Sequence, residues 1–240
     1  VGNIDTIQNI SQVKKISRGT RVHKRTNITR QVTNTDKILN AVVGDDTNLP
    51  KAYTGKDVVF CIIDGGVDFT HPAFKDAEGR SRIKAVYNPY GSTGSFTYAG
   101  KKFPGKLYDT PEEIATLTTD YKDDSHGTHT TGIGAGTHHN EWGGMAPDAD
   151  IVYGYLAPDY NDPVQDDETE NWGMINEINF MQAYLKENNK PGVISLSLGT
   201  QMGPHNGKGI TTEFLDNVAN SGIPVVIAAG NEGDLPLHIY

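Results

Sequence analysis

Four short runs rich in aliphatic residues limit the folds open to this chain more than any other feature. They span residues 58–63, 151–156, 193–198 and 223–229. None of them alternates strictly between apolar and polar side chains, a pattern typical of strands that are buried on both faces of a sheet. The sequence therefore predicts strands that are covered by other elements on both sides.

Helical spacing appears between these runs. Residues 171–189 place apolar side chains on one side of a helix, and residues 210–220 predict a second helix that ends at the Ser-Gly pair 221–222. The apolar positions of the first helix are Met174, Ile178, Met181 and Leu185. An alternation of strands and helices predicts an α/β fold with a mostly parallel central sheet.

Charge and composition exclude several classes of protein. The net charge of −9 argues against a nucleic acid as partner, because phosphate binding needs clustered Lys and Arg. No apolar run approaches the roughly 20 residues that span a bilayer, so we expect no membrane span. The single cysteine, Cys61, excludes an internal disulfide and is predicted to be a buried, inert thiol.

The chain changes character along its length. Residues 1–50 hold many Lys, Arg, Thr and Asn and no aromatic residue. We expect residues 1–20 to be the end of an upstream segment and 21–50 to be a lead-in along the surface of the main domain, 51–240. Within that domain, the Tyr-rich stretch of about 85–124 is predicted to be an insertion that contains a hairpin.

Asp64 is the first candidate for chemistry. It follows the strand predicted at 58–63 and precedes two glycines. An ionised carboxylate at the end of a buried strand is costly unless a donor satisfies it, and an imidazole N–H is one such donor. A common Asp-Gly turn has the same sequence, so this segment alone leaves a structural role open.

His126 and His129 begin a stretch of small residues. They are three apart, so they could share one face of a helix and bind a metal, with His138 or His139 as a third ligand. Use of His126 as a catalytic base and two ordinary histidines are the other interpretations of this stretch.

A third candidate follows the strand predicted at 223–229. That run ends in Gly230-Asn231, which places a side-chain amide at the carboxyl end of the strand. An amide N–H there can donate to a developing negative charge. An ordinary Asn-Glu-Gly turn would have the same sequence.

Together these segments resemble the subtilisin-like (subtilase) family of serine peptidases. The matching motifs lie at 59–68 with His71-Pro72, at 126–129, 143–147, 193–199 and 228–233. They follow one another in the order of the family, which makes the resemblance specific.

The resemblance implies a three-layer α/β fold, of which this chain holds the incomplete, N-terminal part. It implies that Asp64 orients His126, that His126 is the general base, and that Asn231 donates to the oxyanion hole. The implied substrate-binding residues are Ser197, Leu198, Gly199, Ala228, Ala229 and Gly230. A peptide substrate, an inhibitory propeptide whose tail would be residues 1–20, a bacterial source and an extracellular or cell-surface location are implied as well.

The sequence departs from the pattern of the family at the nucleophile. In the family, the nucleophilic serine follows the histidine in chain order. No Gly-Thr-Ser-Met-Ala-like motif occurs in this sequence up to Tyr240. We expect this serine beyond residue 240, in the C-terminal remainder of the domain, so this fragment alone is expected to be inactive. The chain would then be a truncated or a clipped enzyme. A catalytically inactive peptide-binding or regulatory relative is the alternative, and a metal hydrolase based on His126 and His129 is a third hypothesis.

Cofactor expectations rest on one further position. Many members of the family use an acidic residue after the His-Pro pair to bind calcium, and this chain has Ala73 there. That substitution argues against the strong calcium site of the family. No metal or organic cofactor is expected to take part in the chemistry.

Overall fold

A mostly parallel sheet forms the centre of the computed structural model, which describes residues 26–41, 48–90, 94–122, 124–139, 142–156, 167–199 and 206–231. The order of its strands is β5-β2-β6-β1-β7-β8. Only β5 runs antiparallel to its neighbour. The strands are β1 (Val59–Asp64), β2 (Ile83–Asn88), β5 (Lys106–Tyr108), β6 (Asp150–Tyr155), β7 (Gly192–Leu196) and β8 (Val225–Ile227). The predicted α/β class with a mostly parallel sheet is confirmed.

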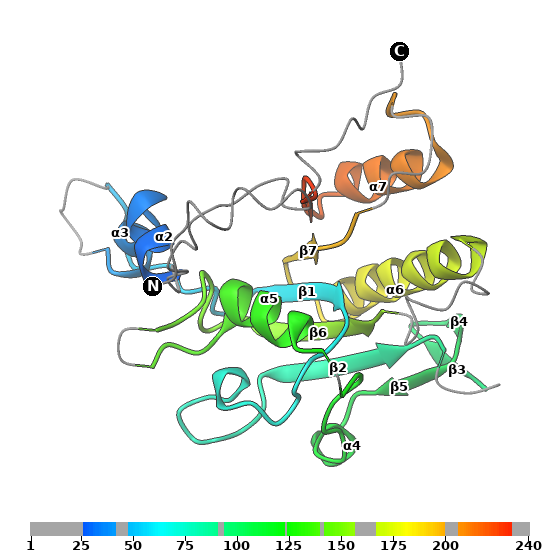
Figure 1. Ribbon diagram of the computed structural model, residues 1–240, viewed down its shortest axis with the longest axis horizontal. Coiled ribbons are helices and arrows are strands. Elements are labelled where there is room, and N and C mark those ends of the chain that lie inside the picture. The colour runs from blue at the N-terminus through cyan, green and yellow to red at the C-terminus, as the bar shows by residue number, and fades with distance from the viewer. Residues whose placement is uncertain are drawn as a thin grey trace, which may run out of the picture.

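Helices lie on both faces of this sheet (Figure 1). One face packs against α5 (His126–Ala135), and the other packs against α6 (Asp167–Glu187) and α7 (Ile210–Asn220). The three layers agree with the architecture that the sequence predicted. The remaining helical segments are α2 (Thr26–Val32), α3 (Thr35–Leu39), η1 (Pro72–Phe74) and α4 (Pro111–Ile114).

Strand β1 shows why the aliphatic runs lack polar alternation. Cys61 and Ile63 belong to the apolar cluster beneath α6, whereas Ile62 belongs to the cluster on the side of α5. All three side chains are fully buried. Since successive side chains of a strand point to opposite faces, a strand covered on both faces needs apolar residues at every position.

Two strands are shorter than predicted. The runs at 193–198 and 223–229 predicted strands to their last residues, but β7 ends at Leu196 and β8 at Ile227. Apolar residues continue beyond the last paired residue, so composition alone did not mark these ends.

The Tyr-rich stretch of about 85–124 contains a hairpin, as the sequence predicted, and whether the stretch is an insertion stays a prediction. Strands β3 (Ser95–Tyr98) and β4 (Lys101–Pro104) pair antiparallel, apart from the main sheet. The expected start at residue 85 falls inside β2, where Tyr87 is fully buried. Aromatic content suggested an insertion, yet Tyr87 packs in the core, with its ring centroid 5.2 Å from that of Phe180.

The predicted propeptide tail at 1–20 lies outside the described residues. Part of the lead-in at 21–50 is helical, since it forms α2 and α3. This part is fixed to the domain, because the backbone N–H of Tyr53 donates to the carbonyl of Ile38 at 3.0 Å. Within the described part of the chain, no helix is both long enough and apolar enough to cross a membrane.

Candidate functional site

Asp64 ends β1 at the carboxyl edge of the sheet, and its side chain is only 1% exposed. The chain then turns sharply at Gly65 and Gly66. Gly66 has a φ of 77°, and a Cβ there would lie 2.7 Å from the carbonyl carbon of Asp124. Both the backbone conformation and the close approach require glycine at this position.

His126 lies against this carboxylate. Its Nδ1 is 2.7 Å from Oδ1 of Asp64, and its side chain is 50% exposed. An ionised carboxylate can only accept hydrogen bonds, so Nδ1 carries the proton of a neutral imidazole. The other nitrogen, Nε2, is then unprotonated and able to accept a proton. This is the arrangement that orients a general base.

Two further donors satisfy the buried carboxylate. Thr130 Oγ1 donates to Oδ2 of Asp64 at 2.7 Å, and the Gly65 N–H donates to Oδ1 at 2.7 Å. These bonds offset the cost of burying a charge. The sequence analysis missed Thr130. Its position four residues after His126, on the same face of the helix, was the signal that could have identified it.

The first turn of α5 is docked on the turn that follows Asp64. The Gly127 N–H donates to the Gly65 carbonyl at 2.6 Å, and the Thr128 N–H donates to the Gly66 carbonyl at 3.2 Å. Oγ1 of Thr128 accepts from the Asp68 N–H at 2.7 Å. These bonds hold the start of the helix, and with it His126, against the end of β1.

The other predicted site residues lie at the same edge of the sheet. Strand β7 pairs parallel with β1, and β8 pairs parallel with β7, so their carboxyl ends share this edge. The predicted substrate-binding residues Ser197, Leu198 and Gly199 follow β7, and Ala228, Ala229, Gly230 and Asn231 follow β8. The structure thus brings Asp64 and His126 into contact and places Asn231 two strands away from β1.

Comparison with known proteins identifies the family. Residues 55–239 match the family model described as the subtilase family. The chain belongs to the subtilase family. This match spans the sheet, both members of the Asp-His pair and the residues that follow β8.

Individual relatives are mainly bacterial proteases. Subtilisin E of Bacillus subtilis (strain 168) is 31% identical over 185 residues, covering 76% of this chain and 36% of its own length. The subtilisin-like protease PopC of Myxococcus xanthus (strain DK1622) is 27% identical over 209 residues, covering 79% and 37%. The solved CspB protease of Clostridium perfringens superposes with a TM-score of 0.62 at 26% identity, covering 84% of this chain and 41% of that chain. This subtilase chain therefore spans about two-fifths of the length of these relatives.

Among the described residues, no third ligand supports the hypothesis of a metal site at His126 and His129. His126 is hydrogen-bonded to Asp64, and His129 is exposed. In the part of this subtilase that the structure describes, no group of three or more His, Cys, Asp or Glu side chains is arranged to hold a metal ion.

A polar pair beneath the site, the partly buried Asp120 and the fully buried Tyr153, also escaped the sequence analysis. Asp120 lies in the stretch predicted as an insertion, and Tyr153 lies in the core strand β6. The Tyr153 hydroxyl is 3.2 Å from Oδ2 of Asp120. Burial raises the pKa of Asp120, and it raises the pKa of Tyr153 well above its usual value. No signal in the sequence linked these two residues.

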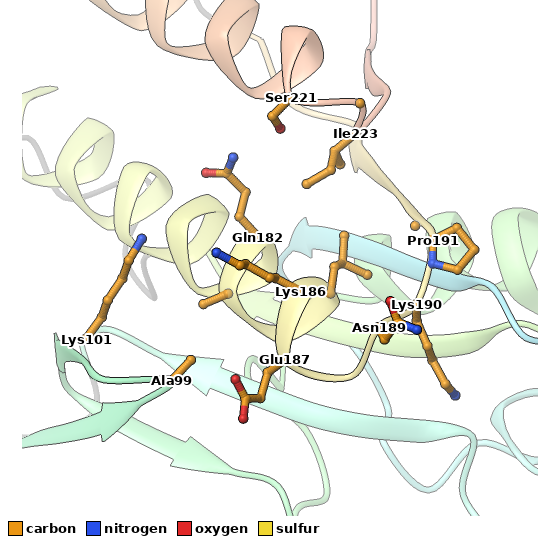
Figure 2. A pocket seen from close by; sticks show the side chains of 14 residues that line it. Ala99, Lys101, Gln182, Lys186, Glu187, Asn189, Lys190, Pro191, Ser221 and Ile223 are labelled. Carbon is orange, nitrogen blue, oxygen red and sulfur yellow. The ribbon is translucent and has the colours of Figure 1, made fainter.

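A separate cavity of about 790 Å³ lies at the opposite end of the sheet. Figure 2 shows Lys101, Lys186 and Glu187 beside it, with Ser221 and Ile223 on its other side. Gly192, the first residue of β7, also lines it. The cavity therefore lies at the amino ends of the strands, and none of the predicted site residues of this subtilase lines it.

Proposed function

We propose that the protein is a subtilisin-type serine endopeptidase with an Asp-His-Ser triad formed by Asp64, His126 and a serine beyond residue 240. The observation that carries the proposal is the 2.7 Å contact between a fully buried carboxylate and a half-exposed imidazole. The family match supports it, because subtilases of known activity are serine peptidases.

In this mechanism, Nε2 of His126 accepts the proton of the serine hydroxyl as the serine oxygen attacks the peptide carbonyl. Asp64 stabilises the imidazolium that forms. The imidazolium then gives its proton to the departing amine, and the C–N bond breaks to leave an acyl-enzyme. A water molecule, deprotonated by His126 in the same way, hydrolyses the acyl-enzyme and releases the second product.

Asn231 is the proposed donor to the oxyanion. Removing the asparagine with this role from a subtilisin lowers kcat about 10²–10³-fold, which sets the expected scale. The residues after β7, Ser197 to Gly199, are proposed to pair with an extended substrate through their backbone. The small residues Ala228, Ala229 and Gly230 are proposed to leave room for the side chain before the cut.

The proposed chemistry requires no metal or organic cofactor, and structural calcium is not part of the proposal. An inhibitory propeptide is a proposed partner. An extracellular or cell-surface location is proposed from the family, which includes a relative named minor extracellular protease Vpr, from Bacillus subtilis (strain 168).

A serine-directed fluorophosphonate probe tests the proposal on the full-length protein. We expect one covalent label per molecule, lost in the His126→Ala variant and retained in the His129→Ala variant, which removes an exposed histidine from the same helix. Because the probe needs an activated serine, a folded protein that takes up no label would contradict the enzyme and support the inactive peptide-binding alternative. No observation in the structure favours that alternative.

A further inference from the structure

The Tyr153 hydroxyl lies where the two elements that carry Asp64 and His126 meet. Tyr153 belongs to β6, which pairs with β1, and its side chain is fully buried. The hydroxyl donates to the backbone carbonyl of Asp64 at 2.5 Å. It also lies so close to α5 that a Cβ at Gly127 would be 2.6 Å from it. One hydroxyl therefore contacts both the end of the strand and the start of the helix.

Asp120 extends this contact to the other end of the turn. Its Oδ2 is 3.2 Å from the Tyr153 hydroxyl, and its Oδ1 accepts from the Val67 N–H at 2.7 Å. Val67 is three residues beyond Asp64. The phenol and the carboxylate thus hold the turn 64–67 at both of its ends.

A tyrosine that only fills the core is the simpler explanation. The Tyr153 ring packs edge-on against Phe69, with the centroids 5.5 Å apart. A phenylalanine would provide the same packing without burying a hydroxyl, which is costly unless hydrogen bonds satisfy it. If the tyrosine only fills the core, removal of its hydroxyl leaves the Asp-His pair in place. If the hydroxyl holds the turn, its removal displaces Asp64 relative to His126.

We propose that Tyr153 and Asp120 are positioning residues, which set the distance between Asp64 and His126 by holding the turn 64–67 against the first turn of α5. The Tyr153 hydroxyl and the Asp120 carboxylate bond to the backbone of Asp64 and Val67 and to each other, so they act through the backbone and not on the reacting groups. The change in kcat that this proposal predicts rests on the proposed peptidase function. The predicted change in the position of His126 relative to Asp64 does not depend on that function.

The kinetic test compares Tyr153→Phe with Tyr155→Phe in the full-length protein. Both variants remove one hydroxyl from β6 and keep a ring that packs on Phe69. With a peptide substrate, we expect Tyr153→Phe to lower kcat about 10- to 100-fold with KM changed less than about twofold, because misplacement of the base slows only the chemical step. Tyr155→Phe should keep the kcat of the parent. Equal kcat values for the two folded variants would overturn the proposal.

A spectroscopic test does not depend on activity. We expect the Nδ1–H proton resonance of His126 to shift in Tyr153→Phe, and hydrogen exchange at the Val67 amide to become faster, with neither change in Tyr155→Phe. If both signals stay at their parental values, the positioning role is wrong. If they change but the parent protein cleaves no peptide, the positioning role stands and the proposed function fails.

Asp120→Asn provides a second variant in case Tyr153→Phe does not fold. It keeps the size of the side chain but leaves one acceptor oxygen in place of the two that meet the Val67 N–H and the Tyr153 hydroxyl. We expect a fall in kcat in the same direction. When both changes are combined, the loss should be smaller than the product of the two single losses, because the two residues hold one turn. Parental kcat and parental His126 signals in a folded Asp120→Asn protein would overturn the proposal.

Discussion

The imidazole of His126 and the carboxylate of Asp64 are 2.7 Å apart although 62 residues separate them in the chain. Backbone bonds support this contact, since the first turn of α5 is hydrogen-bonded to the turn that follows β1. Asp64 is buried and His126 is half-exposed, so one partner is fixed by the core and the other faces the solvent.

This geometry predicts the effect of Asp64→Asn. An asparagine can turn its amide N–H₂ toward Nδ1, which then has to be unprotonated, and the proton moves to Nε2. That tautomer cannot accept the proton of the nucleophile. We expect kcat of the full-length protein to fall about 10⁴-fold with little change in KM. Asp216→Asn, on the surface of α7, is the matched control and should leave kcat unchanged. Asp64→Asn with near-parental kcat would contradict the role of this pair.

Two glycines of α5 make a matched pair for a test of stability. A Cβ at Gly127 would lie 2.6 Å from the Tyr153 hydroxyl and 2.8 Å from the Gly65 carbonyl oxygen, whereas a Cβ at Gly132 would meet none of the described residues within 4 Å. We expect Gly127→Ala to lower the free energy of unfolding by about 2 kcal/mol, because it forces the helix away from the turn. Gly132→Ala should raise it by about 0.5–1 kcal/mol, because alanine favours the helix. Urea denaturation measures both, and equal effects would show that α5 is not tightly docked.

Much of the fold could be predicted from the sequence because its signals were local, whereas the pairing of Asp64 with His126 was implied by the resemblance of their motifs to the subtilase family. The aliphatic runs indicated strands buried on both faces, and Asp64 and His126 stood directly at an element boundary. Thr130, Asp120 and Tyr153 could not be predicted in this way. Their roles come from contacts between distant segments, and a core tyrosine has the same sequence pattern whether or not its hydroxyl holds a turn.

The same limit applies to Arg82, which the sequence analysis did not single out. It is 6% exposed and donates to the carbonyls of Ala149 at 2.5 Å, of Ala73 at 3.1 Å and of Ala135. It also donates to Oγ1 of Thr137 at 3.0 Å. One buried guanidinium thus joins the loop before β2, the end of α5 and the start of β6.

We therefore expect Arg82→Met to lower the free energy of unfolding by about 3 kcal/mol, because it leaves buried carbonyl groups without donors. Arg82→Lys should not restore the parental stability, since one ammonium group cannot reproduce a planar fork of donors. Arg80→Met removes an exposed arginine from the same loop and is the control, for which we expect little change. Thermal unfolding of the three variants measures these changes in stability. Parental stability in Arg82→Met would show that the carbonyls find other donors.

The buried carboxyl group of Glu177 leads to a prediction of how the free energy of unfolding depends on pH. It lies in α6, is 1% exposed, and neither of its carboxylate oxygens has a hydrogen-bond partner among the residues that the structure describes. It faces Gly154 of β6, where a Cβ would lie 2.8 Å from Oε1. Burial raises its pKa well above the usual 4.5. The carboxyl group is therefore protonated in the folded protein at pH values where the unfolded chain has already lost this proton.

Since the folded state then binds more protons than the unfolded state, the contribution of Glu177 to stability is fully present below about pH 4.5. It is lost as the pH rises toward the raised pKa of the folded state, by at most about 1.4 kcal/mol per pH unit. We expect Glu177→Gln to remove this slope, so that the variant gains stability relative to the parent between pH 5 and pH 8. Glu187→Gln, at the exposed end of the same helix, is the control for loss of a charge. Urea denaturation across this pH range checks the prediction, and parallel pH profiles for the parent and Glu177→Gln would mean that Glu177 ionises normally in the folded protein.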